Sequence, residues 1–172
     1  QGYGNKRHHG FVGHSVIGQW VNLGALTTTS DLKNNYGPVR ISIEGRTHDS
    51  GETKVGSFVG DHVKTGIGTL LTTGAVIGAA SNLFGGGALS PKELPAFSWW
   101  DGKSSVPYDL EKFVATARVV CSRRGRSFGE AQEQLTTRMA RINSAYDLLR
   151  DPIRRARHDA SPHARRVWEE DR

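Results

Sequence analysis

Residues 1–90 repeat a six-residue pattern, which constrains the fold more than any other feature of the chain. A mostly apolar residue recurs at every sixth position, and a glycine often follows it directly. The position four residues further on holds mostly small or β-branched residues. The frame positions are Phe11, Ile17, Leu23 and Thr29, and then Val59, Thr65, Leu71, Ile77 and Leu83.

A repeat of six predicts short flat strands joined by tight corners. We expect the frame residue and the small residue four positions later to point into a narrow triangular core, with the glycine relaxing the corner backbone. Each coil buries its inner face only against the next coil, so stability accumulates along a stack. An amphipathic helix would show a 3.6-residue period, and each glycine would cost it about 1 kcal/mol. A flat sandwich would show period two without the six-step recurrence.

The repeat is interrupted by a loop over residues 30–54. Within it, Val39, Ile41 and Ile43 alternate with other residues and precede Glu44-Gly45, which predicts a hairpin extruded from the coil. The stretch from residue 17 to residue 59 is 42 positions, a multiple of six, so the loop should rejoin the stack in phase. Long loops on rigid scaffolds often contact ligands. The alternative is an inserted surface loop that contacts no ligand, because surface loops tolerate insertions.

The composition changes near residue 100, because 18 of the 21 glycines lie at or before Gly87. Two prolines, Pro91 and Pro95, with Phe97, Trp99 and Trp100 predict that segment 91–108 is a linker that caps the last coil. Asp109 predicts a helix N-cap, and Gly125 predicts the end of that helix. Further helices are expected after Ser127 and Asp151. The predicted organisation is therefore a coil domain over 1–90, a capping linker over 91–108 and an α-helical extension over 109–172.

The single cysteine, Cys121, lies on the apolar stripe of the first predicted helix, so we expect a core residue rather than a nucleophile. No histidine has metal-ligand spacing with another, and we expect no metal. The net charge of +6 is concentrated in the helical tail, which favours a solvated surface over a nucleic-acid partner. No apolar run is long enough to span a membrane, and a cytoplasmic protein is expected.

Two stretches carry a family resemblance. Residues 8–32, HHGFVGHSVIGQWVNLGALTTTSDL, are similar to the acetyltransferase half of bifunctional sugar-1-phosphate acetyltransferase/uridylyltransferases. Residues 10–43 and 50–78 look like the C-terminal part of related sugar nucleotidyltransferases. The likeness covers about residues 5–125, and the combination of a histidine, WVNLGA and SDLKNNYG is specific to that family.

The resemblance implies a mainly β fold, a left-handed parallel β-helix of hexapeptide repeats with an extruded hairpin loop and a C-terminal α-helical extension. It implies a homotrimer with sites for an acyl-CoA, such as acetyl-CoA, and for a sugar phosphate or nucleotide sugar between subunits. It also implies that this sequence is a fragment of a bifunctional protein whose nucleotidyltransferase domain lies outside it.

The resemblance also assigns roles to residues. His8 matches the catalytic histidine, and an imidazole suits the removal of a proton from an amine that attacks a thioester. His9 is the adjacent alternative, and a structural interpretation treats both histidines as plain surface residues. The remaining matches are to sugar and acyl-CoA contacts: Asn22, Asp31, Lys33, Asn34 and Asn35 for the substrate, and Ala25 for the cofactor.

Three residues depart from the bifunctional acetyltransferases. Phe11 stands where those enzymes have a tyrosine, Leu26 replaces a glycine next to the acyl site, and Asp31 replaces an asparagine. These departures leave two hypotheses: an acyl-CoA-dependent sugar-phosphate acyltransferase domain, or a catalytically silent β-helix for trimerisation or regulation of a nucleotidyltransferase domain. A weaker resemblance, of residues 142–159 to the last helices of a J-domain, lacks the His-Pro-Asp turn upstream.

Overall fold

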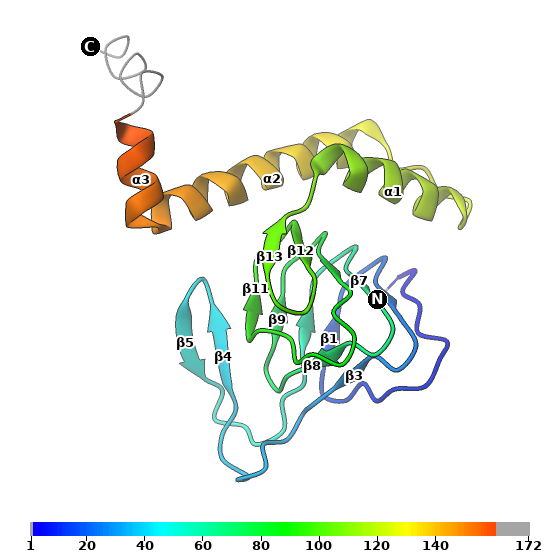
Figure 1. Cartoon of the computed structure of the whole chain (residues 1–172). Coiled ribbons are helices and arrows are strands. Elements are labelled where there is room, and N and C mark those ends of the chain that lie inside the picture. The colour runs from blue at the N-terminus through cyan, green and yellow to red at the C-terminus, as the bar shows by residue number, and fades with distance from the viewer. Residues whose placement is uncertain (1, 161–172) are drawn as a thin grey trace. The chain divides into compact units, whose positions relative to one another are not determined.

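Apart from an antiparallel hairpin over residues 40–49, the strands as far as Trp100 are short, parallel and arranged in three sheets (Figure 1). The computed structural model describes residues 2–160. The chain visits the three sheets in turn and then returns to the first, so that Phe58 pairs with Val76, 18 residues later. The result is mainly β with parallel pairing, which is compatible with a β-helix.

These three sheets contain four, five and two strands, and the strands of each sheet are given below in the order in which they lie side by side. The first sheet contains β1 (Val16–Ile17), β6 (Phe58–Val59), β9 (Val76–Ile77) and β11 (Glu93–Leu94). The second contains the antiparallel β13 (Ser105–Pro107), β12 (Ser98–Trp100), β10 (Asn82–Leu83), β7 (Lys64–Thr65) and β2 (Asn22–Leu23). The third contains β3 (Thr28–Thr29) and β8 (Leu70–Leu71).

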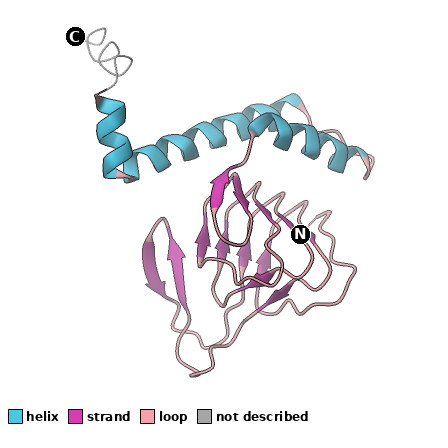
Figure 2. Ribbon diagram, in the orientation of Figure 1, coloured by secondary structure: helices cyan, strands magenta, loops and turns pink. Residues whose placement is uncertain are grey.

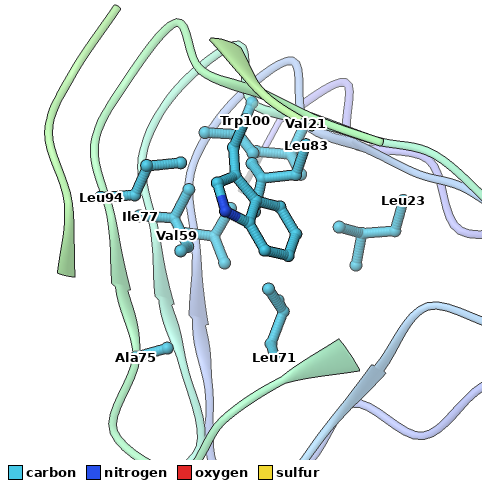
Figure 3. Packing of buried hydrophobic residues seen from close by; sticks show 10 residues of the cluster. Val21, Leu23, Val59, Leu71, Ala75, Ile77, Leu83, Leu94 and Trp100 are labelled. Carbon is cyan, nitrogen blue, oxygen red and sulfur yellow. The ribbon is translucent and has the colours of Figure 1, made fainter. Parts of the chain in front are cut away.

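The frame residues of the repeat point inward, as predicted, with one exception. Leu71, Ile77 and Leu83 are each 1 % exposed and meet in the core (Figure 3). Phe11 is 55 % exposed, so its predicted inward position is wrong. Val12 packs against the core instead, because this coil is one residue shorter than the repeat.

The glycines of the repeat serve close packing between coils rather than the corner backbone. A Cβ added to Gly78 would lie 2.2 Å from the Ala96 nitrogen on the next coil. The left-handed backbone falls two residues after such glycines, at Trp20, His62 and Ala80, which have φ values of 59°, 60° and 60°. A side chain in that conformation costs about 1–2 kcal/mol, so the stacking must hold these corners in place.

The interruption of the repeat forms the predicted hairpin, with β4 (Arg40–Ile43) antiparallel to β5 (Arg46–Asp49) (Figure 2). Glu44 and Gly45 make the two-residue turn with φ values of 52° and 72°, as a twisted hairpin requires. One side chain fastens this turn to the stack. The Glu93 carboxylate accepts hydrogen bonds from Ser42 Oγ at 2.9 Å, the Glu44 nitrogen at 2.5 Å and the Gly45 nitrogen at 3.0 Å.

Parallel pairing continues past residue 90, where the sequence pattern predicted the end of the coils. β11 and β12 extend the first two sheets, so segment 91–108 contains three strands in addition to connecting turns. Trp100 is 4 % exposed and belongs to the core, whereas Trp99 is 38 % exposed. Segment 91–108 therefore adds a coil.

The predicted helices form. The side chain of Asp109 caps α1 (Leu110–Ser122), which buries Phe113, Val114, Ala117 and Cys121. α2 covers Glu130–Arg150, and α3 covers Pro152–Asp159 with Asp151 capping its first turn. The chain divides into two compact units, Gln1–Glu130 and Ala131–Arg172. Within the part of the chain that the structure describes, no helix combines the length and apolarity needed to cross a bilayer.

Candidate functional site

His8 lies near the corner that leads from the second sheet to the third. It is exposed, and its side chain forms no hydrogen bond with any residue in the range 2–160. Its backbone oxygen accepts a hydrogen bond from Lys6 Nζ at 2.8 Å. The neighbouring His9 oxygen accepts one from the Leu26 nitrogen at 2.8 Å. The two histidines therefore lie beside the segment that contains Ala25.

Asn22 and Ala25 occupy the strand and the turn that lead into this corner. Asn22 is exposed, and its Oδ1 accepts a hydrogen bond from Asn5 Nδ2 at 3.0 Å. The Ala25 oxygen accepts one from the Gly68 nitrogen at 2.8 Å. Leu26, next to Ala25, is 57 % exposed with φ at 62°, so its side chain projects from the corner beside His9. His8, Ala25 and Asn22 thus share one region of the surface.

The predicted substrate loop starts at a different corner, between the third and first sheets. Lys33 Nζ donates to the Pro38 oxygen at 3.0 Å, and Asn35 Oδ1 accepts from the Gly37 nitrogen at 3.1 Å. Both side chains are therefore engaged within the loop, whereas Asn34 is exposed. A single chain places the loop and the His8 region at successive corners of its coils, separated by the third sheet.

Asp31 has a partner that the sequence did not predict. Its Oδ2 lies 2.7 Å from His14 Nδ1, and the side chains are 18 % and 51 % exposed. His14 lies at a corner of the coil, with φ at 46°. The one available signal is spacing: the two residues are 17 positions apart, close to one coil, so that they stack as neighbours.

Lys92 is a second cation close to this corner. Its Nζ donates to the Thr73 oxygen, and Thr73 in turn donates to Ser30 Oγ at 2.8 Å. Partial burial lowers the pKa of Lys92, and the positive charge of Lys33 lowers it further. No signal in the sequence pointed to Lys92.

His62 has an environment unlike that of the other described histidines. Its ring stacks on Trp20 with centroids 6.0 Å apart, and it meets the edge of Phe113 from α1 with centroids 5.5 Å apart. Burial lowers the pKa of His62 from 6.5 to about 4, with a further contribution from Lys64 that Asp61 opposes. Nδ1 is buried and unpaired. A histidine held neutral by apolar packing is a structural residue.

The Cys121 thiol is fully buried on α1, as predicted. Burial raises its pKa, with a smaller opposing effect of Lys64, so the thiolate is disfavoured. Within residues 2–160, no group of three His, Cys, Asp or Glu side chains is placed to hold a metal ion.

Comparisons with known proteins support the family expected from the residues. No family model matches the chain. One relative is a bifunctional sugar-1-phosphate nucleotidylyltransferase/acetyltransferase of Sulfurisphaera tokodaii. The two sequences are 36 % identical over 83 residues, which are 48 % of this chain and 21 % of the relative. A second relative is the bifunctional protein GlmU of Methanococcus vannielii. The two sequences are 37 % identical over 111 residues, which are 64 % of this chain and 25 % of the relative.

A third relative, GlmU of Methanocaldococcus jannaschii, is 36 % identical over 72 residues, which are 42 % of this chain and 17 % of the relative. The chain thus spans a quarter or less of the length of these curated relatives. All three relatives are bifunctional proteins by name, and the name of the first joins nucleotidyl and acetyl transfer.

Proposed function

We propose that this chain is the acyl-CoA-dependent acyltransferase part of a longer sugar nucleotidyltransferase-like protein, acting on a sugar phosphate or nucleotide sugar. The observation that carries the proposal is the 36 % identity over 83 residues to a relative named for both nucleotidyl and acetyl transfer. Parallel strands that repeat in register support it, because they provide a rigid scaffold from which the loop over 30–54 projects. Acetyl-CoA is the expected acyl donor, and the cytoplasm is the expected compartment.

The proposed roles follow the resemblance. Asn22 and the loop residues Asp31, Lys33, Asn34 and Asn35 contact the sugar, and the Ala25 backbone lies against the thioester. The resemblance assigns proton removal to His8, whose exposure gives it access to a substrate. Catalysis then depends on positioning two substrates and on removing one proton.

A homotrimer belongs to the proposal. On one chain His8 and the loop lie at successive corners separated by the third sheet. A site that uses both regions needs a second copy to bring one chain's corner against its neighbour's face. Stable interfaces between subunits bury roughly 1,000 Å² or more.

A silent trimerisation module is the second candidate, and two observations favour it. Leu26 projects from the corner beside Ala25 and would narrow a thioester site there. Asp31 already holds His14, so its carboxylate is engaged before any sugar arrives. Such a module would form trimers without binding an acyl donor.

Calorimetric titration of the purified chain with acetyl-CoA separates the two candidates, provided that light scattering measures the mass of the same sample. The acyltransferase proposal expects saturable binding with one site per subunit. An intact trimer that takes up no acetyl-CoA would favour the silent module. His8→Ala tests the proton-accepting role in a transfer assay, with His9→Ala as the matched control because His9 is an adjacent exposed histidine.

A further inference from the structure

The segment that carries His8 is tied to the neighbouring coil on both sides of that histidine. Before it, the Asn5 oxygen accepts a hydrogen bond from the Leu23 nitrogen at 2.9 Å. After it, the His9 oxygen accepts one from the Leu26 nitrogen at 2.8 Å. Within the described range 2–160, no backbone group of residues 6–8 bonds to that coil. The backbone pairing between coils therefore has a gap at His8.

The Lys6 side chain fills this gap. Its Nζ donates to the His8 oxygen at 2.8 Å, so the ammonium group folds back onto the bend that the chain makes at His8 and His9. Backbone oxygens are strong acceptors, and a charged donor gives the stronger kind of hydrogen bond. Lys6 is half-buried, whereas the next two residues, Arg7 and His8, are exposed. Lys6 is thus held against the chain instead of extending into water.

Gly10 makes room for this ammonium group. Its φ is 131°, in the region that favours glycine. A Cβ added to Gly10 would lie 2.9 Å from Lys6 Nζ and would collide with the Thr27 oxygen on the next coil. The Lys6 ammonium group therefore lies close to both Gly10 and the His8 oxygen, and it braces the bend from inside.

The proposed reaction depends on where this bend places the His8 imidazole. The acceptor nitrogen bonds to the thioester carbonyl carbon and gives its proton to the imidazole. The carbon–sulfur bond breaks with its electron pair on sulfur, and the proton passes on to the thiolate. A misplacement of about 1 Å can cost roughly 100-fold in rate. The His8 side chain has no hydrogen-bond partner in the range 2–160, so its backbone must set its position.

We infer that Lys6 is a positioning residue for His8: its ammonium group fixes the bend from which the imidazole reaches the acceptor amine. The inference rests on the proposed acetyl transfer and on the role of His8 in it. Lys6 acts through the His8 backbone and does not touch the substrate. The alternatives are a surface lysine without a role and a lysine that binds the sugar phosphate directly.

The first experiment measures coenzyme A release from acetyl-CoA with an amino-sugar 1-phosphate, using the whole chain. Lys6→Met keeps the length of the side chain and removes the donor. We expect it to lower kcat about 10- to 100-fold, with KM for both substrates unchanged. Lys6→Arg should restore most of kcat, because a guanidinium group can donate to the same oxygen. Arg7→Met is the matched control, since it removes an exposed cation next to His8, and it should leave kcat unchanged.

A double-mutant cycle shows whether Lys6 acts through His8. In a His8→Ala background the effect of Lys6→Met should disappear, because no imidazole is left to position. A direct contact with the sugar phosphate would instead raise KM for the amino-sugar 1-phosphate, and this effect would persist without His8. NMR relaxation of the His8 ring gives a readout that does not depend on activity. The ring should become more mobile in Lys6→Met and not in Arg7→Met.

The outcomes separate this inference from the proposed function. An unsubstituted chain that transfers no acetyl group overturns both. An active chain in which Lys6→Met is as fast as Arg7→Met overturns the inference alone. An effect of Lys6→Met that is equally large with and without His8 has the same consequence, as does a His8 ring whose mobility Lys6→Met leaves unchanged.

Discussion

The fastening of the hairpin by Glu93 yields a quantitative prediction. Its carboxylate accepts three hydrogen bonds from the turn region, one from Ser42 Oγ and two from the Glu44 and Gly45 nitrogens. Glu93→Ala removes all three. Hydrogen bonds to a charged group contribute about 1.5–3 kcal/mol when buried, but these turn nitrogens are exposed and regain water, so about 1 kcal/mol each is reasonable.

The expected total of about 2–3 kcal/mol corresponds to roughly a 30- to 150-fold rise in the open population of the hairpin. Hydrogen–deuterium exchange of a peptide over residues 38–52 measures this directly, because the amides of β4 and β5 should exchange faster by that factor. The melting temperature should change little, since the buried core of the coils is untouched.

Three further variants sharpen this prediction. Glu93→Gln keeps one acceptor oxygen and should give an intermediate exchange rate. Ser42→Ala should have a smaller effect, and none at all when combined with Glu93→Ala. Glu52→Ala is the matched control, because it removes an exposed carboxylate of the same loop whose hydrogen bonds to Val39 and Ser50 come from its backbone. Equal exchange in Glu93→Ala and the unsubstituted chain would refute the fastening role.

Three other predictions concern stability. Folding lowers the pKa of His62 from 6.5 to about 4, so the free energy of unfolding should be highest above pH 6.5 and should fall by about 1–2 kcal/mol towards pH 4, after allowance for solvent screening. Chemical denaturation at several pH values measures this dependence, which should be weaker in His62→Phe. An equal dependence in His62→Phe would contradict the assignment to His62. Gly78→Ala should destabilise the stack by more than about 2 kcal/mol, because the added methyl group would collide with the backbone of Ala96 on the next coil. Gly129→Ala is the control, because the added methyl group meets open space there. Thermal melts of the two variants measure the difference. Thr27→Val should lower the free energy of unfolding in urea by about 1–3 kcal/mol, because Thr65 Oγ1 loses the buried Thr27 hydroxyl, which lies 2.6 Å away. An unchanged free energy of unfolding would show that water takes the place of the Thr27 hydroxyl.

The inner face of the coils could be predicted from sequence because it repeats. Leu71, Ile77 and Leu83 follow a strict six-residue spacing, and the hairpin turn at Glu44-Gly45 has its own local signal. The predicted register was wrong at Phe11, where one coil is a residue shorter than the repeat. The last coil was also missed, because it keeps the backbone pairing without the glycines of the repeat: Pro95 follows Leu94, and Asp101 follows Trp100.

The outer surface was harder to predict, since outward positions carry no periodic constraint. The contact between His14 and Asp31 joins residues on successive coils and depends on the length of one coil, which varies. Lys92 and the loop residue Lys33 are far apart in the sequence, and only the stacked coils bring them close enough for the charge of Lys33 to affect Lys92. His62 looks like a surface histidine until α1 brings Phe113 over it. The expected J-domain-like tail stays a prediction; residues 142–159 are largely helical, in α2 and α3.

The central claim is acetyl transfer by the coil region, and the most direct measurement is mass spectrometry of the sugar product. The chain is incubated with acetyl-CoA and an amino-sugar 1-phosphate, and the acetylated sugar is quantified against free coenzyme A. The account predicts equal amounts of both, formed at a rate proportional to protein concentration. Free coenzyme A without acetylated sugar, or neither product from a chain that is folded and trimeric, would contradict it.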